Sequence, residues 1–121
     1  MEELKLGVVE SKFAEIIWTN GPIPSGELVK ICDRELGWKK STTYTMLKRL
    51  CERGIFQNSN GIVSALMTKA EFEAAQSEKF VEDTFEGSLP AFLAAFTTRK
   101  KLTKEEIDEI LKIIDSAGGE G

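Results

Sequence analysis

The residues best suited to chemistry lie between Trp38 and Gly54, where hydroxyl and cationic side chains recur at helical spacing. At about 100° per residue, they fall on one side of a helix. Hydroxyl, ammonium and guanidinium groups donate hydrogen bonds to phosphate oxygens and base edges. This stretch therefore predicts a helix that can enter the major groove of a DNA duplex. Its candidate contact residues are Lys39, Lys40, Ser41, Thr42, Tyr44, Thr45, Lys48 and Arg49.

The other side of the same helix is small and largely apolar, and it is predicted to be buried. Ser41 is expected to cap the helix, because a serine hydroxyl accepts a hydrogen bond from a free N–H group of the first turn. Gly54 is expected to end it in a left-handed conformation. The predicted buried side consists of Thr43, Met46, Leu47, Leu50 and Cys51.

A second helix is predicted immediately upstream, beginning near Pro24-Ser25-Gly26-Glu27 and closing at Gly37. Two helices joined by so brief a turn form a helix-turn-helix, in which the second helix reads DNA and the first supports it. The apolar stripe of the supporting helix is Leu28, Ile31 and Cys32.

A hairpin is predicted after the reading helix. Strand-like runs at 55–57 and 62–67 flank the segment 58–61, which ends in Asn-Gly, a strong hairpin signal because both residues tolerate positive φ. A reading helix followed by a hairpin is the winged-helix pattern. Asn58 and Asn60 at the tip are further candidate DNA contacts, although the wing strands are poor in charge.

Four more helices complete the predicted fold. The first, Val9 to Thr19, has an apolar face of Val9, Phe13, Ile16 and Ile17, which Trp18 extends into the core. The other three follow the hairpin. A capping box at Thr68–Glu71 opens the first of these, which runs to about Glu86, and Ser88 caps the second. A capping box at Thr103–Glu106 opens the third.

The helices after residue 68 carry more apolar surface than about fifty residues bury alone. Packing against the same helices of a second chain would cover this surface, and two-fold proteins read two-fold operators. A homodimer is therefore expected; the alternative is that these helices fold back onto their own winged helix. The candidate dimer interface is Phe80, Phe92, Phe96, Ile107, Ile110, Leu111 and Ile114.

Charge divides the chain of 121 residues into two parts. Residues 1–69 hold ten basic and eight acidic residues, whereas 70–121 hold six and twelve, which gives the net charge of −4. Salt screens electrostatic interactions beyond about 10 Å, so DNA binding depends on the charge near the contact surface and not on the net charge of the chain. The net positive charge of residues 1–69 is therefore compatible with DNA binding. The expected organisation is a winged-helix DNA-binding domain at 1–69, a helical dimerisation domain at 70–117 and a disordered tail at 118–121.

Composition argues against several other classes of protein. The absence of histidine removes the usual zinc spacings and most base-activated nucleophiles, so neither an enzyme nor a metal or other cofactor is expected. Cys32 and Cys51 lie on apolar stripes and are expected to be reduced. With no long apolar run or signal peptide, a cytoplasmic protein without direct membrane binding is expected.

Two functions fit these features. The first is a homodimeric transcriptional repressor that occupies a two-fold operator in double-stranded DNA through its reading helix and wing. The second is a winged-helix adaptor that binds protein without sequence-specific DNA binding, which the acidic overall balance and the apolar wing favour.

The sequence resembles the penicillinase and methicillin-resistance repressors along nearly its whole length. The resemblance rests on Ile16-Ile17-Trp18, Gly37-Trp38, the pattern Thr42-x-x-Thr45-x-Leu47-x-Arg49-Leu50-x-x-x-Gly54, the acidic and aromatic helices at 71–96, and Lys101-Leu102-Thr103-x-x-Glu106-Ile107. It implies a mostly α fold with a small β-hairpin wing (α+β), a winged helix-turn-helix followed by a C-terminal helical dimerisation part.

The resemblance also implies how repression is relieved. In that family a membrane sensor commonly triggers proteolysis between an asparagine and a phenylalanine of the dimerisation part. The corresponding bond here joins Ala95 to Phe96, so alanine stands in place of asparagine. Tyr44 stands where those repressors often carry a basic residue, which implies a different operator sequence.

Overall fold

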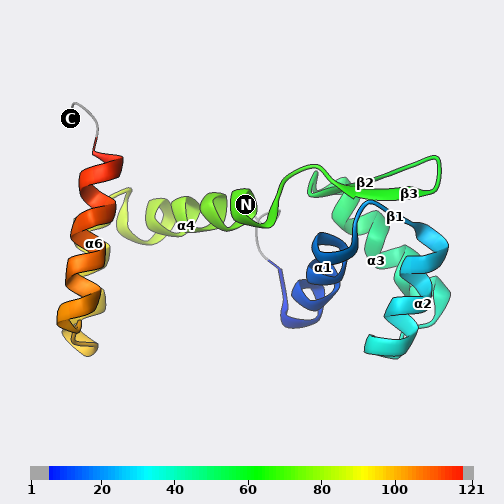
Figure 1. The fold of residues 1–121 in the computed structure, drawn as a ribbon, viewed down its shortest axis with the longest axis horizontal. Helices are drawn as coiled ribbons and strands as arrows, with labels where there is room; N and C mark the ends of the chain where they lie inside the picture. The colour runs from blue at the N-terminus through cyan, green and yellow to red at the C-terminus, as the bar shows by residue number, and fades with distance from the viewer. Residues whose placement is uncertain (1–5, 119–121) are drawn as a thin grey trace. The chain divides into compact units, whose positions relative to one another are not determined.

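The computed structural model describes residues 6–118, which form two compact units divided between Lys79 and Phe80. The N-terminal unit (Figure 1) holds α1 (Val8–Asn20), β1 (Ile23–Pro24), α2 (Ser25–Leu36), α3 (Lys40–Glu52), β2 (Phe56–Ser59), β3 (Ile62–Ala65) and most of α4 (Lys69–Phe85). The C-terminal unit holds the end of α4, α5 (Leu89–Arg99) and α6 (Lys104–Ala117). This confirms the predicted mostly α fold with a winged helix-turn-helix and C-terminal helices.

The turn between α2 and α3 is short because a glycine ends α2 abruptly. Gly37 has φ of +69°, in the left-handed region. Its N–H donates to the carbonyl of Asp33 at 3.1 Å, and the N–H of Trp38 donates to that of Cys32 at 3.3 Å. Both bonds satisfy carbonyls that the helix end leaves without partners. The chain can therefore start α3 only three residues after α2, as predicted.

Gly37→Ala tests this turn. Nothing lies within 4 Å of an added Cβ, so the cost is that of a left-handed alanine, and the free energy of unfolding should fall by about 1 kcal/mol. Gly26→Ala, inside α2 and equally unobstructed, should instead raise it by about 0.5 kcal/mol. Urea unfolding followed by tryptophan fluorescence measures both. Equal effects of the two substitutions would contradict this account of the turn.

The wing is an antiparallel hairpin with a two-residue turn. Ser59 pairs with Ile62 and Asn58 with Val63, while Asn60 and Gly61 between the strands have φ of +53° and +80°. These angles suit the Asn-Gly turn on which the prediction rested. The strands are offset from the predicted runs, since β2 begins one residue later and continues through Ser59, and β3 stops at Ala65.

The third strand of the sheet, β1, was not predicted from the sequence. β1 pairs with β3 in the sheet order β1-β3-β2, with Ile23 opposite Val63 and Pro24 opposite Ile62. A strand of two residues is too short for an alternating pattern, and its proline has no N–H for the ladder. It nevertheless ties the start of α2 to the wing, because the N–H of Ser25 donates to the carbonyl of Gly61 at 2.8 Å.

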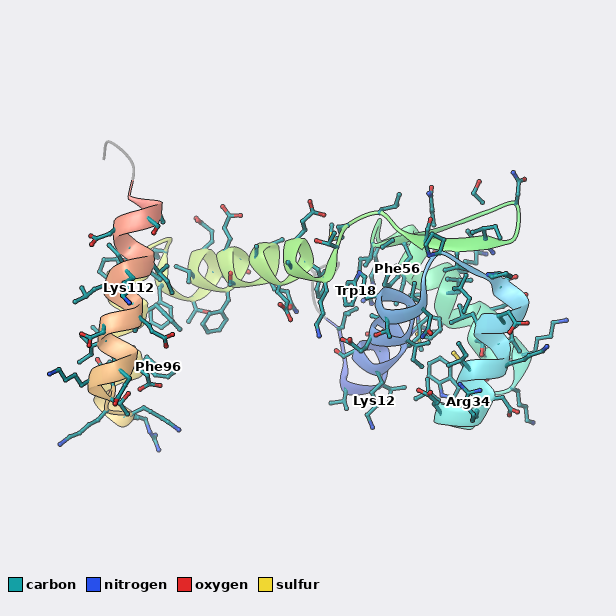
Figure 2. The ribbon with its side chains drawn as sticks, in the orientation of Figure 1. Lys12, Trp18, Arg34, Phe56, Phe96 and Lys112 are labelled. Atoms are coloured by element: carbon teal, nitrogen blue, oxygen red, sulfur yellow. The ribbon has the colours of Figure 1, made fainter. Side chains whose placement is uncertain are left out.

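Trp18 extends the apolar face of α1 into the core, as predicted, and thereby links this helix to the sheet and to α4. Its ring lies 5.3 Å from that of Phe56 and 5.5 Å from that of Phe72, and Figure 2 shows it beside Phe56. Its Nε1–H donates to the carbonyl of Met67 at 3.0 Å. The prediction for Val9 was wrong: it is half exposed, because the part of α1 that packs into the core begins only at Phe13.

The start of α4 packs on α1 within the N-terminal unit. Phe72 is almost completely buried, and Lys69 Nζ lies 2.7 Å from a carboxylate oxygen of Glu15. The predicted capping box is present: Thr68 and Glu71 exchange hydrogen bonds of 2.8 and 3.0 Å. Phe72, which falls within the predicted dimerisation domain at 70–117, thus belongs to the winged-helix core. The boundary between residues 69 and 70 stays a prediction.

The C-terminal unit has the predicted caps and little burial. Ser88 Oγ accepts from the N–H of Ala91 at 3.0 Å, and Thr103 and Glu106 form the second capping box. Neither α5 nor α6, both fully described, contains a buried residue. Of the predicted tail, Gly118 follows α6 and 119–121 lie outside the described residues.

Aromatic rings hold this unit together, while a wide apolar surface is left open. Phe92 lies 5.6 to 6.1 Å from three other rings, those of Phe80, Phe85 and Phe96. Beside it, α5 and α6 border a groove of about 400 Å³ lined mainly by apolar side chains, and Figure 2 shows Phe96 beside α6. Side chains that are 42 to 54% exposed include Phe80, Phe96, Ile107, Leu111 and Ile114.

Candidate nucleic-acid interface

Helix α3 has the two chemically different faces that its sequence predicts. Thr43, Leu47 and Leu50 are at most 2% exposed, and the Thr43 hydroxyl donates to the carbonyl of Lys39 at 3.3 Å. The threonine oxygen is therefore satisfied inside an apolar core. Met46 and Cys51 pack partly buried against the same core. The polar residues exposed on the opposite face and in the preceding turn are Lys39, Lys40, Ser41, Thr42, Thr45, Lys48 and Arg49.

The predicted cap of α3 was wrong. The helix begins at Lys40 with Lys39 in the N-cap position, and no side-chain hydrogen bond from a described residue caps it. Trp38, whose ring lies 5.3 Å from that of Phe13, anchors the turn so that helical geometry starts before Ser41. The hydroxyl of Ser41 therefore stands exposed in the first turn. Gly54 has φ of +81°, as expected.

Tyr44 is placed differently from its exposed neighbours. Its ring is partly buried against the core, and its hydroxyl donates to Ser25 Oγ at 2.9 Å. Ser25 is the first residue of α2. Tyr44 thus links the reading helix to the start of the supporting helix, and its hydroxyl lies where α2 and α3 meet.

Arg49 lies at the edge of the exposed face and is held there by an ion pair. Its Nη1 lies 3.5 Å from Glu10 Oε2, and its side chain is 51% exposed. Arg53 Nη1 lies 3.7 Å from the other oxygen of Glu10, and its side chain is 24% exposed. The N–H of Gly7 donates to Glu10 Oε1 at 3.0 Å. That backbone bond, followed by the two guanidinium groups, lowers the pKa of Glu10.

The wing adds polar groups at its tip and apolar ones along its strands. Asn58 and Asn60 are exposed, and Gln57 donates to the hydroxyl of Ser64 across the hairpin at 3.2 Å. Ile62 and Leu66 are also exposed. The wing can therefore reach a phosphate with its tip, but its strands carry no cation.

Two residues of this region, Glu10 and Ser25, were missed by the sequence analysis as parts of the site. Glu10 is 39 residues from Arg49, so only the fold brings the two together. A signal was present in part, since a glutamate at the third position of a helix is half of a capping box. Gly7 stands where that motif would have serine or threonine, which concealed it.

The remaining chemistry of the described residues is limited. Cys32 and Cys51 are free thiols, as expected, and burial raises the pKa of both. Among residues 6–118, no group of three or more histidine, cysteine, aspartate or glutamate side chains lies close enough together to hold a metal ion. Within the same range, helices of the length and hydropathy needed to cross a membrane are absent.

These features define a class of protein: a winged helix-turn-helix with an exposed cationic and hydroxyl-bearing second helix, followed by a helical C-terminal unit. The family model of the penicillinase repressors matches residues 6–116, so the chain belongs to the penicillinase repressor family, a family of DNA-binding transcriptional repressors. It is 23% identical over 110 residues to a curated penicillinase repressor of Bacillus licheniformis, with 88% of this chain and 86% of that protein covered.

Proposed function

We propose that this protein is a homodimeric transcriptional repressor that occupies a two-fold operator through α3 and the wing. The observation that carries the proposal is the exposed row of hydroxyl and cationic side chains on α3, opposite a face on which Thr43, Leu47 and Leu50 are buried. Ser41 and Thr45 would meet base edges, while Lys39, Lys40 and Lys48 would meet phosphates. A protein bound in this way at a promoter would prevent transcription from it.

Further contacts extend this footprint over more of the duplex. Thr42 and Arg49, at the margin of the exposed face, would contact the backbone or a guanine edge, and Asn58 and Asn60 would touch phosphates from the wing tip. Tyr44 would act from within the α2–α3 junction, where its hydroxyl bonds Ser25. Its proposed role in DNA binding therefore includes holding α3 at a fixed angle to α2.

The dimer would form through the C-terminal unit. The seven candidate interface residues are all in this unit, and five of them are 42 to 54% exposed. Such contiguous apolar surface is unusual on a monomer and typical of subunit interfaces. Two copies of α3 would then face two half-sites, separated by about one helical turn of DNA or a multiple of it.

Relief of repression is proposed to use the C-terminal unit as well. The candidate cleavage bond between Ala95 and Phe96 lies inside α5, with both side chains exposed. Proteases bind extended substrates, so α5 would have to unwind locally before cleavage. A membrane sensor or a protease pathway is the proposed partner at this step.

Salt-dependent binding to genomic DNA tests the proposal. Fragments of the source genome retained by the purified protein are sequenced, and the most enriched is titrated in gel-shift assays at two salt concentrations. Affinity should fall steeply as salt rises, with a slope of log K against log salt of about −0.9 for each neutralised phosphate. Binding that does not respond to salt, or no enrichment of any fragment, would overturn it.

The second candidate is a protein-binding adaptor, which the exposed Ile62 and Leu66 on the wing favour. It predicts a nuclease-resistant complex that Ile62→Ser disrupts and that charge changes on α3 leave intact. Pull-down from a lysate of the source organism, with and without nuclease, separates the two functions. Loss of every partner on nuclease treatment would rule the adaptor out.

A further inference from the structure

Glu10 is an acidic side chain set among the cations beside the proposed DNA-binding face. Its two carboxylate oxygens lie 3.5 Å from Arg49 Nη1 and 3.7 Å from Arg53 Nη1. The Glu10 side chain is 15% exposed, and the N–H of Gly7 fixes its carboxylate by a 3.0 Å hydrogen bond. These contacts place one fixed negative charge between the guanidinium groups of Arg49 and Arg53 near the end of α3.

A carboxylate and a DNA phosphate compete for the same guanidinium group, because each offers oxygens that accept its N–H donors. A cation already paired in the free protein adds less to counterion release on binding DNA, and counterion release dominates binding to arbitrary sequence. The same pairing restricts the rotamers of a long side chain. Glu10 therefore weakens the general attraction of Arg49 for DNA while it fixes the direction in which that side chain points.

We propose that Glu10 is a specificity-determining positioning residue of the DNA-binding face: by holding Arg49 and Arg53, it limits binding to arbitrary duplex and orients Arg49 for the operator. The inference rests on the proposed DNA-binding function and adds a residue outside α3 and the wing to it. Glu10 acts through the arginines and need not touch DNA.

Glu10→Gln tests the inference, because glutamine keeps an oxygen for the Gly7 N–H but loses the charge. Affinity for a duplex of about 30 base pairs with scrambled sequence should rise about three- to tenfold at low salt, with a salt slope steeper by about 1. Affinity for the enriched genomic duplex should rise less, because the freed guanidinium gains phosphate attraction but loses its orientation. The ratio of the two affinities should therefore fall.

Glu15→Gln is the matched control. Glu15 lies on the same helix and its loss changes the net charge equally, but its partner is Lys69 on α4. This variant should keep the affinity ratio of the native protein. Glu10→Asp, which keeps the charge but withdraws it by one methylene from both arginines, should shift the ratio in the direction of Glu10→Gln by a smaller factor.

Two outcomes separate the inference from the function on which it rests. If the native protein binds neither duplex, the proposed function fails and the inference with it. If the native protein binds with the expected salt dependence and Glu10→Gln, Glu10→Asp and Glu15→Gln all keep its affinity ratio, the inference alone is overturned. Circular dichroism melting of each variant confirms that the winged helix is folded in these assays.

Discussion

Replacing Lys48 and Arg49 together by alanine should weaken binding to the enriched genomic duplex at least about 100-fold at moderate salt. Both side chains are on the exposed face of α3. Each substitution therefore removes a cation from the proposed contact with phosphates or guanine. The magnitude of the salt slope should fall by about 1 to 2, because Lys48 loses a full phosphate contact whereas Arg49, paired with Glu10, adds less to counterion release. Gel-shift titrations over a range of salt concentrations measure both quantities.

A charge-matched double variant provides the control for this loss. Lys104→Ala with Lys112→Ala removes two exposed cations from α6 and leaves α3 intact. It should bind DNA within about threefold of the native protein, because these cations lie outside the proposed footprint. Neither double variant should unfold the protein, since the four lysine and arginine side chains are exposed and Glu10 keeps the Gly7 N–H and Arg53 as partners after Arg49 is lost. Equal loss of binding in both would contradict a DNA contact by α3.

Leu111→Glu should convert the proposed dimer to monomers over the micromolar range, with the dissociation constant raised at least about 100-fold. Leu111 is 54% exposed within the C-terminal unit, on the side of α6 that Ile107 and Ile114 share. A carboxylate there would be desolvated without a partner if the dimer formed through this face, at a cost of several kcal/mol. Sedimentation equilibrium measures the change.

Ser116→Glu adds the same charge to α6, about 140° around the helix from Leu111. The Ser116 hydroxyl donates a hydrogen bond to the carbonyl of Lys112 on the same helix, and the side chain is exposed. This variant should remain dimeric and bind DNA as the native protein does. A Leu111→Glu variant that sediments like Ser116→Glu would place the dimer interface elsewhere.

The periodic elements could be predicted from sequence because each carries its own signal. The pattern of Thr43, Leu47 and Leu50 fixed the buried face of α3, and Thr103 with Glu106 fixed the start of α6. Both ends of α1 and α4 and the start of α6 were accordingly predicted within two residues of those observed. Such features depend on neighbours along the chain, which a sequence displays directly.

Features that depend on distant partners were missed or misplaced. Ser41 is not a cap, because the packing of Trp38 on Phe13 lets α3 start at Lys40. The pairing of Ile23 with Val63 that makes β1 joins segments far apart in sequence. Glu10 reaches Arg49 across 39 residues. None of these contacts has a local pattern, so tertiary packing alone determines them.

The burial of Phe72 has a practical consequence for isolating the DNA-binding half of the chain. A recombinant fragment truncated after residue 69 would leave the indole of Trp18 without the ring that lies 5.5 Å away, and would expose fresh apolar surface to solvent. Extending the fragment to Lys79, where the compact unit ends, retains that aromatic stack. A soluble, monomeric DNA-binding fragment designed for crystallisation with duplex DNA should therefore include more than half of α4.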